Sequence, residues 1–485
     1  MSSKEAAPVA DTPAAAPQHH DPGLRRGVMG GAELAAQAIA SIAPSAVIAF
    51  TAAAIYLSAG NGTWVSFVLA TIVILAVGYT ISQFAKRRAS AGSLYTYASL
   101  GLGPFGAYLT GVTLIIGCFG IASGSLSGST VYMITVLNQL GIPVSGMLAN
   151  VVVTIVLGAL AILFTVRGIR LSARVSLTLE LISVAIILTL LVTSIVYLGP
   201  DAFDPGQFSL EGVEFSGVVF GMTLGILGFV GFSSADALGR EARNPFKAIP
   251  RAIMWSALGV GVLYVFAAYT QVALLGEDLG TSASPLDDMA TIVGMPAWFN
   301  PVLNLGVAAS FFAVVVAPIN VIGRIVYVMG KEGVVPRRLG VTHGTQLTPY
   351  RAILTLGPAA VALTTLLYLM NVDGMSIVVW VDTFGTYGYM VAYAAVAIAS
   401  VIWLRRQGVK NWLVLPSAAL AVIAMAYVFF TNVVPVPAFP LNIIPWLFLV
   451  VLAAAIGWYG YLKARRPEVI AAIGSTEVDV LEGIG

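Results

Sequence analysis

The stretch Gly228-Phe229-Val230-Gly231-Phe232-Ser233-Ser234 interrupts an apolar block that runs over residues 214–238. A block of about 20 apolar residues is long enough to cross the hydrocarbon core of a membrane as a helix. A helix that only anchors a protein needs no glycines or serines at mid-depth, because they weaken the helix and bring polar groups into the hydrocarbon. The block is therefore predicted to be a membrane helix that is broken near its middle.

A comparable interruption, Ser41-Ile42-Ala43-Pro44-Ser45, lies inside the apolar block 33–58. Pro44 has no N–H to donate, so one carbonyl near Ala40 loses its helical partner. If the first ten apolar blocks form two groups of five, the two interrupted blocks lead their groups. Paired interruptions of this kind indicate a transporter site built on inverted repeats. The alternative is that proline and glycine, which are frequent in membrane helices, only kink or pack them.

The composition of the whole chain is typical of a membrane protein. Of its 485 residues 58% are hydrophobic and 9% are charged, whereas soluble domains carry about 25% charged residues. The sequence therefore predicts an all-α polytopic membrane protein with twelve transmembrane helices. The third and eighth blocks exceed the hydrocarbon thickness, so we expect them to tilt or to extend into a loop helix. The twelve blocks are 33–58, 63–84, 104–138, 146–166, 174–198, 214–238, 251–275, 297–328, 350–370, 375–402, 413–432 and 442–463.

The basic residues predict the orientation and the domain organisation. With the N-terminus inside, all 24 Lys and Arg residues fall in cytoplasmic tails or loops, and the outward loops carry only acids. By the positive-inside rule, the chain is a multi-pass protein of the cell (inner, cytoplasmic) membrane with both termini cytoplasmic. The tails, residues 1–23 and the acidic residues 467–485, are expected to be disordered. Residues 24–466 then form the transport domain, with helices 1–5 over 33–198, helices 6–10 over 214–402 and helices 11–12 over 413–463.

Several function classes are excluded. The single cysteine, Cys118, rules out a disulfide framework and a cysteine-based metal site. None of the three histidines lies in an apolar block, and no lysine precedes Ser or Thr as a Walker A loop requires. We expect no enzyme activity, no cofactor, no metal and no nucleic acid. The expected partners are a small-molecule substrate (an amino acid or an amine), a proton or sodium ion, and the lipid bilayer.

The two interruptions predict the chemistry of the substrate. A half-helix N-terminus suits a carboxylate, and freed carbonyls suit an ammonium group or a sodium ion. No Lys or Arg lies at mid-depth, so backbone dipoles are the natural partners of a zwitterion such as an amino acid. Phe232, directly after Gly231, is a candidate lid over the substrate, with core packing as the alternative. The predicted substrate-binding residues are Ser41, Ile42, Ala43, Pro44, Ser45, Gly228, Phe229, Gly231, Phe232, Ser233 and Ser234.

Three acids lie within the blocks, and each should face protein or water, because an acid at the membrane centre costs at least about 2.5–3.5 kcal/mol. Glu180 is surrounded by apolar neighbours, so it is either a proton-coupling site or a structural hydrogen-bond partner of a neighbouring helix. Asp236 precedes Arg240 by four residues, which favours a helical ion pair. Asp382 is either part of the outer pathway or a near-interface acid.

The third block carries Gly120, Gly124 and Gly128, a ridge of small residues that favours close helix packing over a ligand role. Serines alternate with these glycines, and Ser123 is a candidate residue of the pathway.

Four stretches of the chain resemble the amino acid–polyamine–organocation transporters. They are Arg88-Ala89-Ser90-Ala91-Gly92-Ser93-Leu94-Tyr95-Thr96-Tyr97 with Leu100-Gly101; Gly168-Ile169-Arg170-Leu171-Ser172-Ala173-Arg174; Gly231-Phe232 through Arg240-Glu241-Ala242-Arg243-Asn244-Pro245 with Ile249-Pro250-Arg251-Ala252-Ile253; and Asn320, Arg324, Tyr327, Gly333 and Pro336 with Thr348-Pro349. The resemblance implies a LeuT-type fold of two inverted five-helix repeats plus two C-terminal helices. It also implies alternating access, with substrate bound at the breaks of the first and sixth helices.

The chain departs from this family at three places. The Gly-rich break of the first helix is replaced by Ser41 to Ser45, and the Glu that follows Gly-Phe in the sixth helix is Ser233. The lysine that some proton-coupled members carry in the fifth helix is replaced by Ser183, one turn from Glu180. Glu180 and Ser183 are therefore candidate binding residues for the coupling ion or proton.

The leading hypothesis is a secondary transporter of amino acids that works by proton-coupled symport or by exchange. The alternative is a polyamine or organic-cation transporter of the same fold, in which Glu180 and Asp382 neutralise the amines. A channel, a non-transporting receptor and a major-facilitator transporter are less well supported, because the sequence has no filter-like repeated loop and the 238–251 connection is short.

Overall fold

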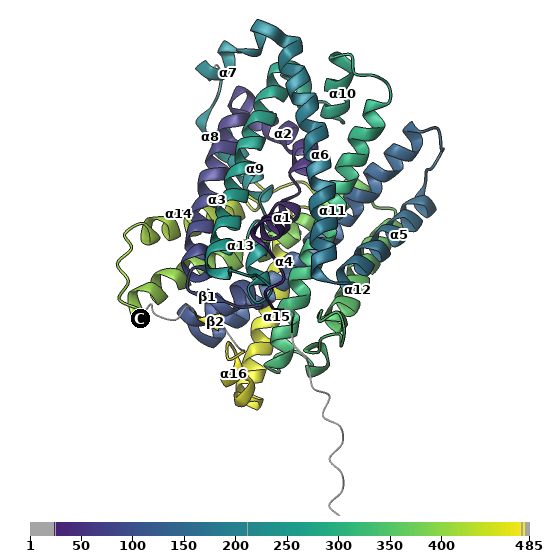
Figure 1. Ribbon diagram of the computed structural model, residues 1–485. Coiled ribbons are helices and arrows are strands. Elements are labelled where there is room, and N and C mark those ends of the chain that lie inside the picture. The colour runs from purple at the N-terminus through teal and green to yellow at the C-terminus, as the bar shows by residue number, and fades with distance from the viewer. Residues whose placement is uncertain (1–23, 25, 211, 477–478, 481–485) are drawn as a thin grey trace, which may run out of the picture.

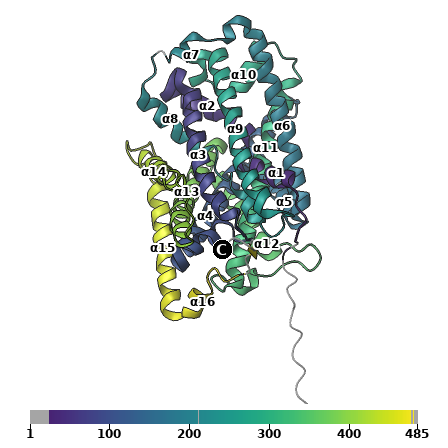
Figure 2. The same cartoon turned by 60° about the vertical axis from the view of Figure 1, so that its left-hand side comes forward.

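The protein is a bundle of long helices, seen here in a computed structural model that describes residues 24, 26–210, 212–476 and 479–480 (Figures 1 and 2). In this part of the chain, ten helical stretches are long and apolar enough to cross a membrane. One of them, Gly31–Ala85, contains three α-helices and a short 3-10 helix, and the shorter apolar helix Phe215–Leu227 adds to the ten. The prediction of an all-α polytopic membrane protein is confirmed.

The elements follow the predicted blocks in order along the chain. The first half holds α1 (Gly31–Ile42), α2 (Pro44–Ala59), η1 (Gly60–Gly62), α3 (Thr63–Ala85), β1 (Arg88–Ala89), α4 (Ser93–Gln139), α5 (Met147–Val166), α6 (Ile169–Leu198), η2 (Gly199–Ala202) and α7 (Pro205–Ser209). The second half holds α8 (Phe215–Leu227), η3 (Ser234–Leu238), α9 (Pro245–Leu275), η4 (Gly276–Gly280), α10 (Pro285–Ile292), α11 (Phe299–Lys331), η5 (Arg337–Leu339), α12 (Tyr350–Leu369), α13 (Gly374–Arg406), α14 (Val414–Thr431), α15 (Ile444–Arg465), α16 (Pro467–Ala472) and β2 (Asp479–Val480).

Glycines let the long helices α4 and α13 pack closely in the interior. A Cβ added at Gly120 would lie 2.6 Å from the Cα of Gly385, and one at Gly124 would lie 2.2 Å from Oδ1 of Asp382. Gly128 packs in the same way against the ring of Phe311 in α11. The small-residue ridge of the third block is therefore a packing surface, as predicted.

The helix α4 is longer than its apolar block. It begins at Ser93 and is kinked at Gly103, whose φ of 71° precedes Pro104. The kink separates a first segment, 93–102, from the part that matches the block 104–138. The added segment lies before the block, so the tilt or extension expected of the block itself stays a prediction.

The two ends of the bundle differ in charge. The short helices α7, which Asp204 caps, and α10, which contains Asp287 and Asp288, lie at the upper end of Figure 1. The pair β1–β2 and α16 lie at the lower end. Helices α11, α13 and α15 finish in basic residues. We call the end of the bundle at which these helices finish the basic end.

The C-terminal segment is ordered over much of the range in which the sequence predicts disorder. Helix α16 buries Val469, the following Ile473 is also buried, and Thr476 donates two hydrogen bonds to Oε1 of Glu332. These contacts outweigh the acidic composition of the segment, because burial of apolar side chains offsets the entropy of ordering. The prediction for residues 1–23 lies outside the described residues.

Candidate functional site

The first predicted break is present and separates α1 from α2. Ala43 adopts a left-handed conformation, with φ 53° and ψ 62°, between the last turn of α1 and Pro44 at the start of α2. The N–H of Ala43 donates the last hydrogen bond of α1 to the carbonyl of Ile39. The carbonyl of Ala43 accepts the first hydrogen bond of α2 from the amide of Val47. The amides of Ser45 and Ala46 therefore have no partner within the helix, as at any helix N-terminus.

A buried carboxylate occupies this N-terminus. Oε1 of Glu180, which projects from α6, accepts hydrogen bonds from the amide (3.3 Å) and the hydroxyl (3.1 Å) of Ser45. The amide of Ala46 donates to Oγ of Ser310 in α11 at 3.3 Å. Glu180 is fully buried, and its Oε2 has no hydrogen-bond partner among the described residues. The positive end of the α2 dipole thus faces a carboxyl group of the protein itself and would stabilise its ionised form.

The second predicted break is also present, between α8 and η3. Helix α8 ends at Leu227, and turns lead through Gly231, whose φ of +91° favours glycine, into η3. Two tyrosines bind the freed backbone groups. The hydroxyl of Tyr393 in α13 accepts from the amide of Gly231 (3.2 Å), and that of Tyr264 in α9 donates to the carbonyl of Gly228 (2.8 Å).

The two breaks are in direct contact. A Cβ added at Gly231 would lie 2.9 Å from the carbonyl oxygen of Ser41, and one at Gly228 would lie 2.8 Å from Cγ1 of Val47. The hydroxyl of Ser234 also donates to the carbonyl of Gln37 in α1, at 2.9 Å. Residues that are almost two hundred positions apart in the sequence are thus brought into one site. Ser41 contributes a buried hydroxyl without a hydrogen-bond partner among the described residues.

Phe229 and Phe232 are fully buried beside this site. The ring of Phe229 packs edge-on against Tyr264, with centroids 5.0 Å apart, and that of Phe232 against Tyr393, at 5.4 Å. The ring of Phe232 also lies against Gly78 in α3. Both rings have core contacts, and the role of Phe232 as a lid remains a prediction.

The other predicted residues lie at varying distances from the breaks. The hydroxyl of Ser183 donates to the carbonyl of Gly306 in α11 at 2.6 Å, one turn before Ser310. The hydroxyl of Ser123 donates to the carbonyl of Phe119 in the same helix. Asp382 packs against Gly124, and its Oδ1 has no hydrogen-bond partner in the described part of the chain. Neither Ser123 nor Asp382 has a hydrogen bond to a residue of the two breaks within that part.

The predicted ion pair between Asp236 and Arg240 is not formed. Oδ1 of Asp236 instead accepts a hydrogen bond of 2.5 Å from the hydroxyl of Ser93 at the start of α4. Asp236 lies in the 3-10 helix η3, not in an α-helix, so a residue four positions later does not share its face. The acid therefore ties the second broken helix to the α3–α4 loop.

Sequence reasoning missed Tyr264, Tyr393 and Ser310, which bind the freed backbone groups. Each is a polar residue inside an apolar block, and this is the signal that could have pointed to them. The signal is weak, because membrane helices carry many serines and tyrosines that only pack or bond within their own helix.

A buried ion pair joins α11 to the segment that follows the second break. Arg324 of α11 donates two hydrogen bonds to the carboxylate of Glu241, Nε at 2.8 Å and Nη2 at 2.7 Å, and both side chains are fully buried. The carbonyl of Glu241 accepts from the amides of Val28 and Met29, which lead into α1, at 2.8 Å each. The start of α1 is thus fixed to the segment after the second break.

Aromatic rings stack beside the first break, because Phe311 directly follows Ser310 in α11. The ring of Phe311 is stacked with those of Phe50 and Tyr132, with centroids 6.4 and 5.8 Å away. Nearby, the amide of Asn304 donates to the carboxylate of Asp287 in α10. Burial raises the pKa of Asp287, the hydrogen bond from Asn304 lowers it, and neighbouring Asp288 raises it further.

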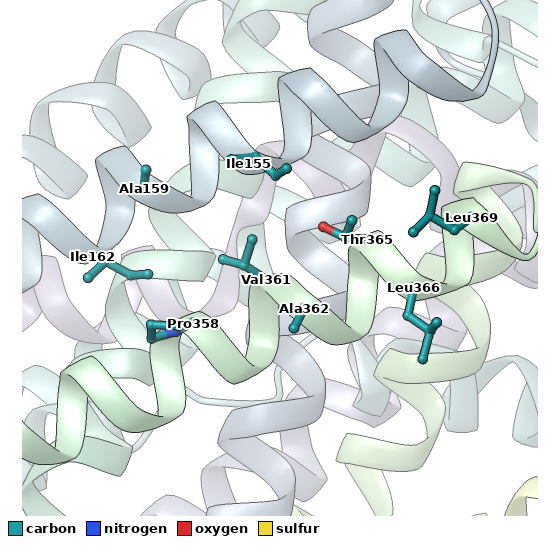
Figure 3. A pocket seen from close by; sticks show the side chains of 9 residues that line it. All are labelled: Ile155, Ala159, Ile162, Pro358, Val361, Ala362, Thr365, Leu366 and Leu369. Carbon is teal, nitrogen blue, oxygen red and sulfur yellow. The ribbon is translucent and has the colours of Figure 1, made fainter.

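A groove on the lateral surface is distinct from this site. It has a volume of about 590 Å³, and Figure 3 shows apolar side chains of α5 and α12 facing one another across it. The hydroxyl of Thr365 is its one side-chain oxygen or nitrogen, so the groove offers little for recognising a polar substrate. Its lining residues are Ile155, Ala159, Ile162, Pro358, Val361, Ala362, Thr365, Leu366 and Leu369.

Comparison with known proteins identifies the family. A model of amino acid permeases matches residues 33–456, which include both breaks. The chain belongs to the amino acid permease family. The permease is 29% identical to an uncharacterised transporter of Mycobacterium tuberculosis, over 76% of this chain and 78% of that protein. It is 25% identical to the branched-chain amino acid permease BcaP of Bacillus subtilis, over 72% of this chain and 75% of that protein. The resemblance to amino acid–polyamine–organocation transporters is thereby confirmed.

The fold of the permease is similar to that of a Na⁺-coupled sialic acid symporter in a substrate-bound, outward-open state. The similarity covers 83% of this chain and 89% of that one, with a TM-score of 0.53 and 10% sequence identity. At so low an identity the likeness concerns the fold alone.

Proposed function

We propose that this permease is a secondary active transporter that moves amino acids across the cytoplasmic membrane by alternating access. It has twelve spans, arranged as two inverted five-helix repeats plus two C-terminal helices, with both termini in the cytoplasm. The family match and the transporter relatives support the class of function, and the distribution of the Lys and Arg residues supports the orientation.

The observation that carries the proposal is the contact between the two broken helices. Gly231 lies against the carbonyl of Ser41, so the exposed backbone groups of both breaks line one place in the interior. Such paired breaks supply N–H groups for an anion and carbonyls for an ammonium group or a cation. The substrate-binding residues of this proposal are those of the two breaks, 41–45 and 228–234.

Glu180 is the proposed coupling residue, and Ser183 supports it from the same face of α6. Oε1 of Glu180 binds the amide of Ser45, so gain of a proton at Glu180 would weaken the hold of α6 on the start of α2. This arrangement supports proton-coupled symport or exchange. The similar symporter is Na⁺-coupled, and sodium remains the alternative ion. Ser123 and Asp382 are proposed to line the pathway further out.

One observation favours a second candidate function, the transport of polyamines or other organic cations. Glu180 already occupies the N-terminus of α2, where the carboxylate of an amino acid would be expected to bind. Its Oε2 is buried without a hydrogen-bond donor among the described residues, and an ammonium group would supply one. A substrate recognised in this way needs an amine but no carboxylate.

A thermal-shift screen of the detergent-purified protein separates the two candidates. Ligands that bind only the folded state raise the melting temperature by mass action. An amino acid that stabilises the protein, while its decarboxylated amine does not, would support amino acid transport. Stabilisation by amines alone would support the second candidate. If neither class shifts the melting temperature or is taken up by proteoliposomes, both candidates are wrong.

The substitution Glu180→Gln tests the coupling residue. Glutamine keeps an acceptor for Ser45 but cannot release a proton, so uptake of an amino acid is expected to lose its pH dependence. If the substrate is an amine, its affinity should instead fall by a factor of roughly thirty or more, because one partner of a buried charge pair is removed. Proteoliposome uptake from pH 5.5 to 8 measures both effects.

The matched control is Glu277→Gln, which makes the same change at an exposed acid of η4 outside the two breaks. It should leave the pH profile intact. An unchanged pH profile and an unchanged affinity in Glu180→Gln would exclude Glu180 from coupling and from recognition alike.

A further inference from the structure

A second polar site lies outside the two breaks, between the starts of α1 and α9 at the basic end. It is a pocket of about 350 Å³ that opens at the surface of the bundle. A Cβ added at Gly31, on its α1 side, would meet no atom within 4 Å. The lining residues are Gly31, Ala35, Asn244, Lys247, Ala248, Arg251, Ala252 and Trp255.

Two positive charges in this pocket are not balanced by the protein. Lys247 and Arg251 are exposed, and neither side chain has a hydrogen bond or an ion pair in the described part of the chain. Glu33, the acid of α1, is held on the other side of that helix by Arg174 of α6, at 3.2 Å. The side chain of Asn244 forms no capping hydrogen bond at the start of α9, so its amide is available to a ligand.

The exposed side chains on one face of α9 change from charged to apolar along the helix. Lys247, Arg251 and Trp255 follow one another at intervals of four residues, so they lie on the same side of the helix. Trp255 is 69% exposed, and Leu258 and Val262 continue the exposed apolar surface beyond it. From the helix end inward, the surface offers cations, then an indole, then aliphatic side chains. This is the order in which a membrane lipid presents its headgroup, its interfacial region and its acyl chain.

We infer that this pocket binds an anionic phospholipid of the surrounding bilayer. Its phosphate lies between Lys247 and Arg251, and one acyl chain follows α9 past Trp255. Basic pockets between transmembrane helices near the cytoplasmic surface bind such headgroups. The apolar continuation distinguishes a lipid from a free phosphate ion, which would use only the charged part of the pocket. The lipid would contact both α9 and the first turn of α1, the helix that leads to the first break.

The test compares lipid binding to the full-length protein and to two matched double variants. Lys247→Gln/Arg251→Gln removes the two charges of the pocket. Arg405→Gln/Arg406→Gln removes the same charge from the end of α13, where both arginines are exposed. Native mass spectrometry in neutral detergent measures the binding of phosphatidylglycerol, phosphatidylcholine and soluble glycerol 3-phosphate. Melting temperatures in phosphatidylcholine check that the variants fold.

The wild-type protein should bind phosphatidylglycerol in preference to phosphatidylcholine. Binding should weaken roughly thirty-fold in the pocket variant, because each cation near an anionic headgroup contributes about a fivefold effect. It should change less than about twofold in the α13 variant. Equal weakening in both variants would overturn the proposal in favour of a diffuse surface charge. Glycerol 3-phosphate binding as tightly as phosphatidylglycerol would overturn it in favour of a soluble phosphate compound.

A third variant keeps the test decisive if the double variant does not fold. Ala35→Phe fills the pocket from the α1 side and leaves every charge in place. It should also weaken the binding of phosphatidylglycerol, and unchanged binding in this variant would place the lipid elsewhere.

Discussion

The two broken helices expose the same kinds of backbone groups, but the protein binds these groups with different chemistry. At the first break, the carboxylate of Glu180 accepts from the amide of Ser45. At the second, the neutral hydroxyl of Tyr393 accepts from the amide of Gly231, and that of Tyr264 donates to the carbonyl of Gly228. A carboxylate changes its charge when it gains a proton, whereas a phenol is uncharged near neutral pH. The first break is therefore the one whose contacts a proton can switch.

The largest effect on folding is expected from Gly231→Ala, which breaks the contact between the two regions. Its φ of +91° disfavours any residue with a Cβ, and the new methyl would lie 2.9 Å from the carbonyl of Ser41. Strain and overlap together should cost about 2–5 kcal/mol. We expect a strongly lowered melting temperature in detergent and loss of uptake in proteoliposomes.

The control for this prediction is Gly259→Ala in the middle of α9. No atom lies within 4 Å of a Cβ there, and the backbone has no positive φ. Alanine is preferred over glycine in a helix, so this variant should be unchanged or slightly more stable. Equal stability of the Gly231 and Gly259 variants would mean that the two breaks are not in tight contact.

A smaller effect is expected from Tyr393→Phe. The substitution leaves the amide of Gly231 buried without its acceptor, which costs about 1–3 kcal/mol. The melting temperature should fall, but uptake should keep the pH dependence of the wild-type protein, because no titrating group near neutral pH is removed. A changed pH profile in this variant would contradict the contrast between a charged first break and a neutral second break.

Local rules made the breaks predictable from the sequence. Pro44 lacks an N–H, and Gly231 tolerates a positive φ, so each marks its own site of interruption without reference to the rest of the chain. The apolar blocks are equally local, since each block without an interruption corresponds to one helix. The close packing of α4 followed from the spacing of the glycines in a single block, but its partner, α13, did not.

The partners of the breaks were not predictable in the same way. Tyr393 lies 162 residues from Gly231, and Glu180 lies 135 residues from Ser45, so tertiary packing alone brings them together. The bond of Asp236 to Ser93 was missed because an α-helical register was assumed where the chain forms a 3-10 helix. The order of 467–476 was missed because composition carries no information about a docking surface such as Glu332.

The smallest effect is expected from Ser45→Ala, which sharpens the comparison at the first break. The variant loses the hydroxyl contact to Oε1 of Glu180 at 3.1 Å but keeps the amide contact at 3.3 Å. Loss of one such hydrogen bond costs about 0.5–1.5 kcal/mol. Uptake should remain, with a pH midpoint displaced by less than about one pH unit, because about 1.4 kcal/mol corresponds to one unit. A loss of pH dependence as complete as that expected for Glu180→Gln would show that the hydroxyl of Ser45, and not the dipole of α2, holds the carboxylate in place.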